Sequence, residues 1–329
     1  MIIGGGGMVG QKLAQALTRS AKIANHEITS LALADAASPA DIAEHSSFEI
    51  KKVVADITNP VAASSLVVDK PDLIFHLAAI VSGEAEANLE KGYAVNVEGI
   101  KNVLEAIKAT GNGYKPKLVF TSSVAVYGGP YPDVIDDDFH LQPRTSYGAQ
   151  KAIAELLVND YTRKGFVDGI SIRLPTICIR PGKPNKAASG FFSNILREPL
   201  VGIEAILPAQ KSATNIFASP RSAVGFLIHA ASIDAASLGD NRALMMPGVW
   251  GSVQDEIDAL RRVAGDEVVS LIKEQIDPVI EKMLTNWNFP RFTSAKALLL
   301  GFKSESTLDQ IIQIHIEDEL GGRITGLTK

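Results

Sequence analysis

Two hydrophobic patterns alternate along the first part of the chain. Short apolar runs with the length of β-strands occur at residues 1–3, 28–34, 53–55, 72–77, 117–121 and 169–174. Between them, apolar residues recur at helical spacing over residues 8–19, 93–110 and 147–164. Strands that alternate with helices are typical of βαβ units, so about the first 175 residues predict a parallel sheet covered by helices.

The pattern changes in the second part of the chain. A loop rich in Pro, Gly and Lys covers residues 180–186. Strands are expected at residues 214–218 and 243–246, and helices at residues 222–232, 253–264, 268–287, 294–300 and 308–320. We therefore predict an α/β protein with a doubly wound parallel sheet and a smaller C-terminal mixed α/β lobe.

The composition is that of an ordinary globular protein. Of the 329 residues, 46% are hydrophobic and 21% are charged, and the net charge of −5 gives no general attraction to nucleic acid or to an anionic membrane. Cys178 is the only cysteine, which excludes a disulfide within the chain and a cluster of thiolate metal ligands. It lies in an apolar run, where we expect it to be buried.

No segment predicts a membrane span or a secretion signal. The longest strongly apolar stretch without a charge, residues 73–83, has about half the length that a membrane-spanning helix needs. The start of the chain has neither a basic region nor a long apolar region. We therefore expect a cytoplasmic protein.

Glycine residues follow the first apolar run and precede the first helix. They satisfy the spacing Gly5-x-Gly7-x-x-Gly10 and also Gly4-x-x-Gly7-x-x-Gly10. In this position, glycines allow a tight turn and let backbone N–H groups and a helix N-terminus approach a pyrophosphate. The expected contacts are Gly4, Gly7, Met8, Val9 and Gly10. The apolar run before them is short, and we expect the chain to begin within the strand.

Asp35 follows the second strand pattern, 25 residues after Gly10. A carboxylate there accepts hydrogen bonds from the adenosine ribose and repels a 2′-phosphate, and the two alanines after it offer no arginine for that phosphate. We therefore expect a Rossmann-type sheet that binds NAD rather than NADP. The alternative is that Asp35 only ends a strand. Asp56 and Ile57 are a candidate adenine contact, with an ordinary loop aspartate as the alternative.

Tyr147 and Lys151 lie four positions apart in a helical pattern, and therefore on one face of the helix. A free phenol titrates at about 10 and is a poor base, but a nearby ammonium group favours the phenolate. Such a pair can remove a hydroxyl proton while hydride leaves the substrate. Ser123 ends an earlier strand pattern, where open α/β sheets bind ligands, and can hold the substrate oxygen. Alternatively, Ser122 and Ser123 only satisfy backbone groups of a turn.

These motifs, in this order, resemble the extended short-chain dehydrogenase/reductase family, which includes NAD-dependent sugar-nucleotide epimerases and dehydratases. The resemblance rests on the glycine loop, Asp35, Asp56-Ile57, residues 76–79, 95–99, 121–128 and 173–176, and Tyr147-x-x-x-Lys151. It covers about the first 180 residues. One departure is Ile3, where the family usually has threonine.

The resemblance implies a role for each matching residue. Tyr147 would be the general base or acid, Lys151 would orient it and the nicotinamide ribose, and Ser123 would polarise the substrate hydroxyl. Asn96 would occupy a proton-relay or structural-water position. The nicotinamide half would be lined by Ala78, Ala79, Pro175 and Thr176. His76 is a candidate acid or base, but its place at a strand end favours a packed side chain.

The same motifs divide the chain. We expect residues 1–178 to form an NAD-binding Rossmann domain, to which segments near residues 213–240 return, and residues 179–329 to form mainly a substrate-binding lobe. By resemblance, a homodimer is expected through the helices at residues 93–110 and 147–164.

A cationic loop follows the strand that is expected to contact the nicotinamide. Three cations lie within residues 180–186, and cations suit an anionic substrate, although the lysines could also form a solvated turn. The expected substrate contacts are Arg180, Lys183, Asn185 and Ser189, with Ser123; further candidates are Arg221, Trp250 and Arg291. Residues 179–192, 197–200 and 301–321 resemble the D-erythronate dehydrogenase branch of the family. That resemblance implies NAD-dependent oxidation of the C2 hydroxyl of a four-carbon sugar acid.

Two other functions share the cofactor motifs. A sugar-nucleotide epimerase or dehydratase would recycle its NAD and release no NADH. Val124 and Ala125 stand where a dehydratase would have acidic residues, which argues against that reaction. A non-catalytic NAD sensor would usually lack the Tyr or the Lys. The six histidines are scattered and predict no metal site.

Overall fold

The structure is a computed structural model that describes residues 1–182, 189–284 and 288–325. The chain divides into two compact units. The first unit consists of Met1–Val126, Thr145–Leu174 and Val224–Met246, and the second consists of Tyr127–Arg144, Pro175–Ala223 and Pro247–Lys329. Each unit is described by itself below.

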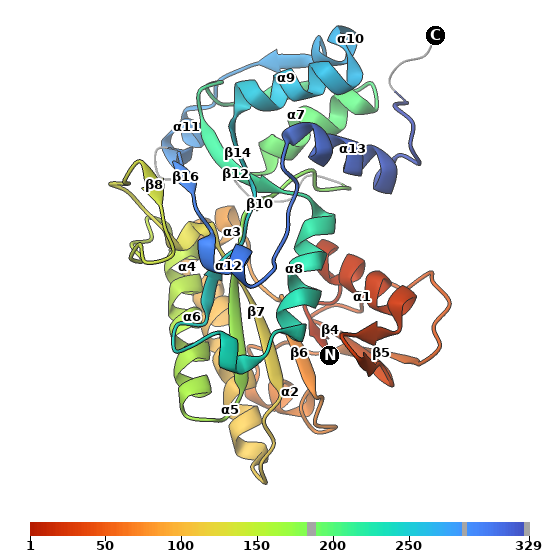
Figure 1. The fold of residues 1–329 in the computed structure, drawn as a ribbon, viewed down its shortest axis with the longest axis vertical. Helices are drawn as coiled ribbons and strands as arrows, with labels where there is room; N and C mark the ends of the chain where they lie inside the picture. Colours follow the sequence, from red (N-terminus) through yellow and green to blue (C-terminus); the bar gives the residue numbers. More distant parts are fainter. Residues whose placement is uncertain (183–188, 285–287, 326–329) are drawn as a thin grey trace. The chain divides into compact units, whose positions relative to one another are not determined.

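Seven parallel strands form the sheet of the first unit, as the alternating pattern predicts (Figure 1). In spatial order they are β13 (Ala243–Met245), β9 (Asp168–Leu174), β7 (Lys117–Ser123), β6 (Leu73–His76), β1 (Ile2–Ile3), β4 (Ser30–Asp35) and β5 (Glu49–Val54). The chain order reverses at β1, which lies between β4 and β6. Open α/β sheets bind ligands beyond the carboxyl ends of the strands at such a reversal.

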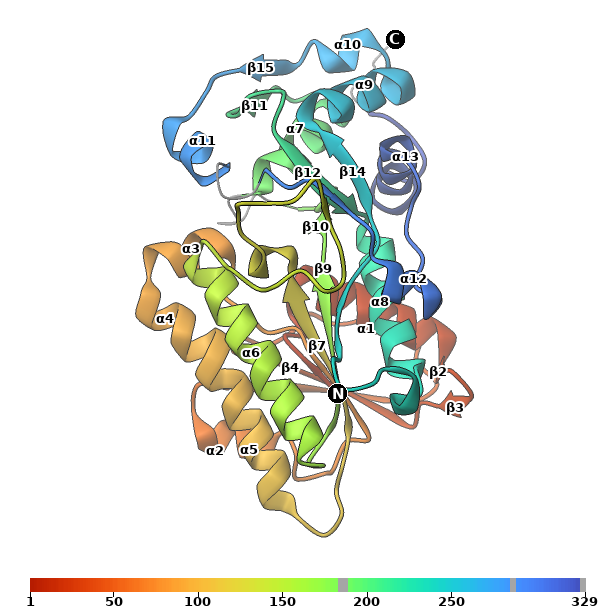
Figure 2. The same cartoon turned by 60° about the vertical axis from the view of Figure 1, so that its left-hand side comes forward.

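Helices cover both faces of this sheet. Helices α4 (Leu89–Tyr93), α5 (Ile100–Thr110) and α6 (Ser146–Arg163) run along one face, and α1 (Met8–Ser20) and α8 (Pro220–Ser232) lie on the other (Figure 2). The chain between β6 and β7 also forms α3 (Ser82–Ala87) and a π-helix, η1 (Ala94–Gly99), and α2 (Pro60–Ser65) follows β5. The core between the sheet and the α5–α6 face is mainly aliphatic, with Ile74, Ile100, Leu104, Leu118 and Val158 among its buried members.

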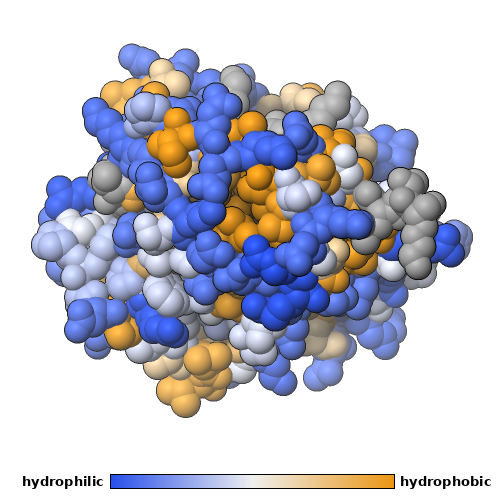
Figure 3. All heavy atoms as spheres, turned by 90° about the horizontal axis from the view of Figure 1, so that it is seen from above, coloured by the Kyte–Doolittle hydropathy of each residue, from blue (hydrophilic) through white to orange (hydrophobic). Residues whose placement is uncertain are grey.

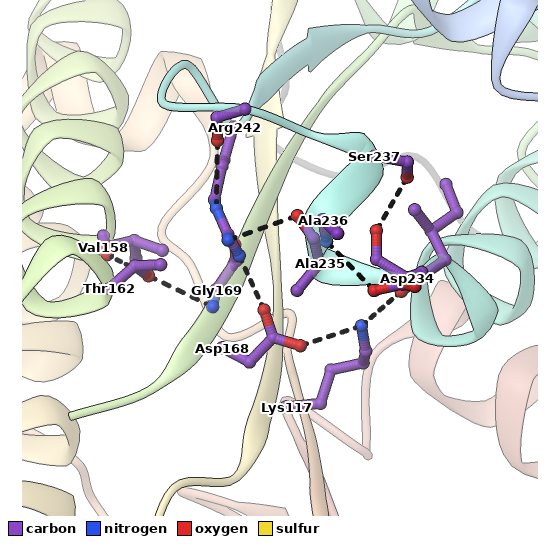
Figure 4. Close-up of polar contacts among 12 residues, drawn as sticks. Lys117, Val158, Thr162, Asp168, Gly169, Asp234, Ala235, Ala236, Ser237 and Arg242 are labelled. Carbon is purple, nitrogen blue, oxygen red and sulfur yellow. Dashed lines mark hydrogen bonds and ion pairs between the residues drawn. The ribbon is translucent and has the colours of Figure 1, made fainter. Parts of the chain in front are cut away.

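Charged residues connect the amino ends of three strands of this sheet (Figure 4). Asp168 begins β9, and its carboxylate pairs with Lys117 of β7 at 3.1 Å and with Arg242, next to β13, at 2.6 Å. Lys117 Nζ also donates to the backbone oxygen of Ile233 at 2.6 Å. These contacts fix the late strand β13 to the edge of the sheet.

Three small sheets and a helical layer form the second unit. The strands are β10 (Thr176–Ile177), β12 (Thr214–Ala218) and β14 (Val249–Ser252) in one sheet, β11 (Ala205–Leu207) with β15 (Ile272–Glu274), and β16 (Arg291–Phe292) with β8 (Val134–Ile135). The helices are α7 (Gly190–Leu200), α9 (Val253–Ala264), α10 (Asp266–Val269), α11 (Pro278–Leu284), α12 (Ala295–Leu299) and α13 (Leu308–Glu319). Their core holds Phe192, Phe217, Leu260 and Ile312. The face seen in Figure 3 carries hydrophobic residues in its middle, surrounded by hydrophilic ones.

One predicted element is wrong. The pattern over residues 268–287 predicts one long helix, but the described part of this segment forms the end of α10, strand β15 and helix α11. Strand β15 pairs in parallel with β11, and Pro278, which has no backbone N–H, begins α11 instead of continuing a helix. The pairing with a distant strand outweighs the local helical spacing. None of the helices in the described residues is long and apolar enough to cross a membrane.

Candidate active site

The glycine loop connects β1 to α1. Gly4 has a φ of 90°, and a Cβ there would lie 2.5 Å from the backbone nitrogen of Ala78. A Cβ on Gly10 would lie 2.3 Å from the backbone oxygen of Gly4, so these two positions require glycine. Gly7 is the N-cap of α1, and the first turn of this helix, which includes Met8 and Val9, contains no acidic residue. Its N–H groups and the helix dipole therefore suit a phosphate group.

The Asp35 carboxylate lies beside this loop at the end of β4. Its Oδ2 accepts the N–H of Gly6 at 2.9 Å, and its Oδ1 accepts the N–H of Ala36 at 2.8 Å. Both hydrogen bonds fix the carboxylate next to the glycine turn, where an adenosine ribose would meet it. The residues present thus fit a dinucleotide.

Asp56 and Ile57 have different environments. The Asp56 carboxylate is exposed and accepts the N–H of Thr58 at 2.9 Å, so it forms a local turn. Ile57 is buried, and its backbone oxygen accepts a hydrogen bond from Asn102 Nδ2 at 2.9 Å. Sequence reasoning did not single out Asn102, which holds this loop from helix α5.

Lys151 lies in the interior of the first unit, 2% exposed, on helix α6. Its Nζ donates to the backbone oxygen of Thr121 on β7 at 2.8 Å and lies 5.8 Å from the centroid of the Tyr147 ring. Burial lowers the pKa of Lys151 to about 7, and the carboxylate of Glu155 opposes that change. The structure therefore brings the predicted Tyr–Lys pair together.

Glu155 is itself held by a buried arginine. Arg173 near the end of β9 donates from Nη2 to Glu155 Oε2 at 2.8 Å and from Nε to Oε1 at 3.0 Å. This ion pair fixes α6 to the sheet one turn beyond Lys151. Sequence reasoning missed it, although a Glu four residues after Lys151 on the same helix face was a usable signal.

Ser123 ends β7, and α6 packs against this strand and the 3-10 turn η2 (Val124–Val126) that follows it. The Ser123 hydroxyl oxygen accepts the N–H of Ala125 at 3.1 Å. Its own proton remains able to donate to another oxygen. The adjacent Ser122 is buried, and its hydroxyl has no hydrogen-bond partner among the residues that the structure describes.

Asn96, on the π-helix, is 2% exposed and fully engaged as a donor. Its Oδ1 accepts the N–H of Ile80 at 2.8 Å, and its Nδ2 donates to the backbone oxygen of Ile80 at 3.1 Å and to Gln150 Oε1 at 2.7 Å. Asn96 thus holds the loop that contains Ala78 and Ala79. The sequence analysis predicted no role for Gln150. The available signal was that this polar residue lies on the same face of α6 as the buried Ala154 and Val158.

His76 and Cys178 are core residues, as their apolar contexts predict. His76 is 1% exposed, its ring lies 5.7 Å from that of Phe120, and burial together with Lys151 lowers its pKa to about 3. It is therefore neutral at physiological pH. Cys178 is buried, and burial together with Glu256 raises the pKa of its thiol.

The other candidate residues belong to the second unit. Pro175 and Thr176 are buried, and the Thr176 hydroxyl donates to Asn215 Oδ1 at 3.0 Å. The half-buried Arg180 donates from Nε to the backbone oxygen of Ile177 at 2.9 Å and from Nη2 to Ser189 Oγ at 3.0 Å. Lys183 and Asn185 lie outside the described residues.

The three further candidates differ in their contacts. Arg221 pairs with Glu317 at 2.9 Å and with Asp318 at 2.5 Å, so its charge is used within the unit. The Arg291 guanidinium lies 4.4 Å from the ring centroid of Trp250. Within residues 1–182, 189–284 and 288–325, no group of three or more His, Cys, Asp or Glu side chains could hold a metal ion.

A glycine loop at a helix N-terminus, an acidic residue at the second strand, and a tyrosine beside a buried lysine define a class of dinucleotide-dependent α/β enzymes. Comparison with known proteins gives the family. A sequence model of the NAD dependent epimerase/dehydratase family matches residues 1–209. The chain therefore belongs to this family, as an NAD-dependent oxidoreductase of the extended short-chain dehydrogenase/reductase type.

Several relatives match almost the whole chain. It is 39% identical to the D-erythronate dehydrogenases of Cupriavidus necator (97% of this chain, 98% of that protein) and Haemophilus influenzae (97% and 99%). A crystal structure described as a nucleoside-diphosphate-sugar epimerase from Agrobacterium tumefaciens is 53% identical, with a TM-score of 0.94 over 98% of this chain and 94% of that chain. The L-threonine dehydrogenase of Clostridium difficile, 22% identical with a TM-score of 0.83 over 98% of both chains, shares the fold.

Proposed function

We propose that the protein is an NAD-dependent dehydrogenase that oxidises the C2 hydroxyl of a small sugar acid, with D-erythronate as substrate and 2-dehydro-D-erythronate as product. The observation that carries this proposal is the buried ammonium group of Lys151, held by Thr121 beside the Tyr147 ring. Two D-erythronate dehydrogenases that match almost the whole chain support the choice of substrate.

Tyr147 would act as the base. When Lys151 is protonated, its positive charge favours the phenolate of Tyr147, which takes the proton of the C2 hydroxyl. Ser123 would donate a hydrogen bond from its O–H to the same hydroxyl oxygen, while its own oxygen accepts the N–H of Ala125. When bound, NAD would accept the hydride that leaves C2.

NAD would be held mainly by the first unit. The N–H groups of Met8 and Val9, in the first turn after the N-cap Gly7, suit the pyrophosphate, and Asp35 suits the adenosine ribose. In the first unit, Ala78 and Ala79 are proposed to line the nicotinamide half. Asp56 is proposed to contact the adenine from the exposed turn in which its carboxylate accepts the N–H of Thr58.

The carboxylate of the sugar acid would be bound by Arg180 of the second unit. The hydrogen bonds of this guanidinium to Ile177 and Ser189 orient it, and the planar guanidinium of an arginine can bind a carboxylate at two points. Lys183, Asn185 and Ser189 are proposed to contribute to the same binding.

A direct test measures NADH formation when the protein is mixed with NAD and C4 to C6 sugar acids. We expect NADH with D-erythronate and a lower kcat/KM with longer acids. Arg180→Lys keeps the charge but loses the two-point contact with a carboxylate, and should raise the KM for the acid more than it lowers kcat. If no four-carbon sugar acid yields NADH, the dehydrogenase proposal is wrong.

A second candidate function is supported by the 53% identical crystal structure described as a nucleoside-diphosphate-sugar epimerase. Such an enzyme would interconvert nucleotide sugars and return the hydride to the substrate. Nucleoside-diphosphate sugars in the same screen would then be epimerised without net NADH, and NAD would copurify with the protein.

A homodimer remains a proposal. Within the two segments predicted to form it, Tyr93 on α4 and Leu156 on α6 are 38% and 65% exposed, and both helices cover the same face of the sheet (Figure 2). Sedimentation should give a dimer, and Leu156→Glu should weaken it because a charge would be buried at the contact.

A further inference from the structure

The residue before Lys151 is a buried amide that the reaction does not use directly. Gln150 is 0% exposed, and its Oε1 accepts a hydrogen bond from Asn96 Nδ2 at 2.7 Å. Because Asn96 also binds both the N–H and the backbone oxygen of Ile80, the three residues form one connection. We call Ile80, Asn96 and Gln150 the amide bridge.

The amide bridge joins two parts of the first unit that the proposed reaction needs in register. Ile80 belongs to the loop after β6, directly following Ala78 and Ala79. Gln150 belongs to α6, between Tyr147 and Lys151. Asn96 lies between them on the π-helix η1, a form of helix that frequently occurs at functional sites. No other side chain in the described residues is hydrogen-bonded to Ile80.

Gln150 is a poor choice for packing alone. Its Nε2 has no hydrogen-bond partner among the described residues, and such a buried, unpaired group destabilises a fold. Gly92 of α4 leaves the space for it: a Cβ at Gly92 would lie 2.5 Å from Nε2 and 3.0 Å from Oε1. An apolar side chain of similar length would fill the same space without an unpaired amide.

We propose that Gln150 is a positioning residue, which holds the loop at Ile80 in register with the helix that carries Tyr147 and Lys151, through Asn96. The proposal rests on the proposed function, since Tyr147 and Lys151 are the reacting pair. Gln150 does not touch the reacting atoms. Its contribution is geometric, because small misplacements of reacting groups lower turnover strongly.

Two variants of nearly equal size separate the hydrogen bond from packing. Gln150→Glu keeps an oxygen that accepts from Asn96 Nδ2, whereas Gln150→Met keeps the length and loses the acceptor. Asn159→Met on the same helix, at a half-buried position outside the bridge, is the matched control. All three should fold, which circular dichroism and the melting temperature would establish.

Hydrogen–deuterium exchange at the Ile80 amide tests the bridge without any reaction. We expect exchange to be about tenfold faster in Gln150→Met than in the wild type, and close to wild type in Gln150→Glu and Asn159→Met. Unchanged exchange in Gln150→Met would overturn the proposal, whether or not the protein oxidises a sugar acid.

Steady-state kinetics tests the positioning role. For Gln150→Met we expect kcat to fall about tenfold while the KM for the sugar acid and the melting temperature change little. Gln150→Glu should recover most of kcat. Faster exchange with an unchanged kcat in Gln150→Met would overturn the positioning role. An equal loss of kcat in Gln150→Met and Gln150→Glu would overturn it too. If the wild type releases no NADH, the proposed function fails and the exchange result still decides the bridge.

Discussion

The polar side chains at the two ends of the parallel sheet differ in whether they have hydrogen-bond and ion-pair partners. At the amino ends, Lys117, Asp168 and Arg242 form ion pairs and hydrogen bonds in which each charge has an opposite partner (Figure 4). Near the carboxyl ends, His76 and Ser122 have buried polar atoms with no hydrogen-bond partner in the described part of the chain. Lys151 lies among them with a pKa lowered to about 7 by burial.

We infer from this difference that the amino ends of the strands contribute mainly to stability and the carboxyl ends mainly to the reaction. Satisfied charges at the amino ends stabilise the edge of the sheet and have no reaction to perform. Unsatisfied or perturbed groups at the carboxyl ends cost stability, and such costs are typical of functional sites. Substitutions at the two ends should therefore fail in different ways.

The largest effect is expected at the carboxyl end. Tyr147→Phe removes the hydroxyl that would take the substrate proton, and kcat should fall about 1,000-fold. NAD affinity, measured by calorimetry, should change less than about threefold, because the proposed phosphate and ribose contacts are on the glycine loop and Asp35. If the variant retains turnover, Tyr147 is not the base. The proposed division between a stabilising amino end and a reactive carboxyl end would then lose its main support.

The next largest effect is expected at the amino end. Asp168→Ala leaves Lys117 and Arg242 facing each other without their shared carboxylate, and should lower the free energy of unfolding by about 2 kcal/mol. Urea denaturation would measure this loss. Asp160→Ala, which breaks an exposed pair with Arg163, is the control and should cost less than about 0.5 kcal/mol. A fall in kcat of folded Asp168→Ala would contradict the separation of the two ends.

A smaller effect tests the cofactor part of the carboxyl end. Asp35→Asn removes the charge that would bind the adenosine ribose and repel a 2′-phosphate. The affinity for NAD should fall about tenfold, and the preference for NAD over NADP should fall by more. Calorimetry with both dinucleotides measures this. A preference that does not change would mean that Asp35 only ends β4.

The features that could be predicted from the sequence are local. The glycine loop, Asp35 and the Tyr147–Lys151 spacing each depend on a few neighbouring residues, and the sheet follows from a repeated pattern. Residues 80, 96 and 150 are far apart in the chain, and no sequence pattern indicates that they are hydrogen-bonded to one another. The amide bridge therefore became visible only in the folded first unit.

The second unit was harder to predict for the same reason. Strand β15 forms because β11 pairs with it, and nothing in residues 268–287 signals that partner. Arg180 was predicted as a substrate contact from the cationic loop in which it lies, but that pattern does not predict its hydrogen bonds to Ile177 and Ser189. Local periodicity is least informative where short strands pair across long segments of chain.

The smallest expected effect tests whether a buried group with a shifted pKa always belongs to the active site. Glu256 of α9 is 0% exposed, 3.7 Å from the Cys178 sulfur, and burial raises its pKa well above the usual value, with Asp255 adding to that direction. The folded protein then holds a proton that the unfolded chain loses above a pH of about 4.3. Stability lost to Glu256 should therefore grow as pH rises from that value toward the raised pKa.

Glu256→Gln removes this titration and keeps the shape of the side chain. Its free energy of unfolding, relative to the wild type, should rise with pH and reach about 1 kcal/mol in favour of the variant near neutral pH, as urea denaturation at several pH values would measure. Turnover should stay unchanged. A pH-independent difference would show that Glu256 is ionised in the folded protein. A loss of turnover would instead show that this buried carboxyl takes part in the reaction. Groups with shifted pKa values outside the parallel sheet would then be candidates for the active site, like those at its carboxyl ends.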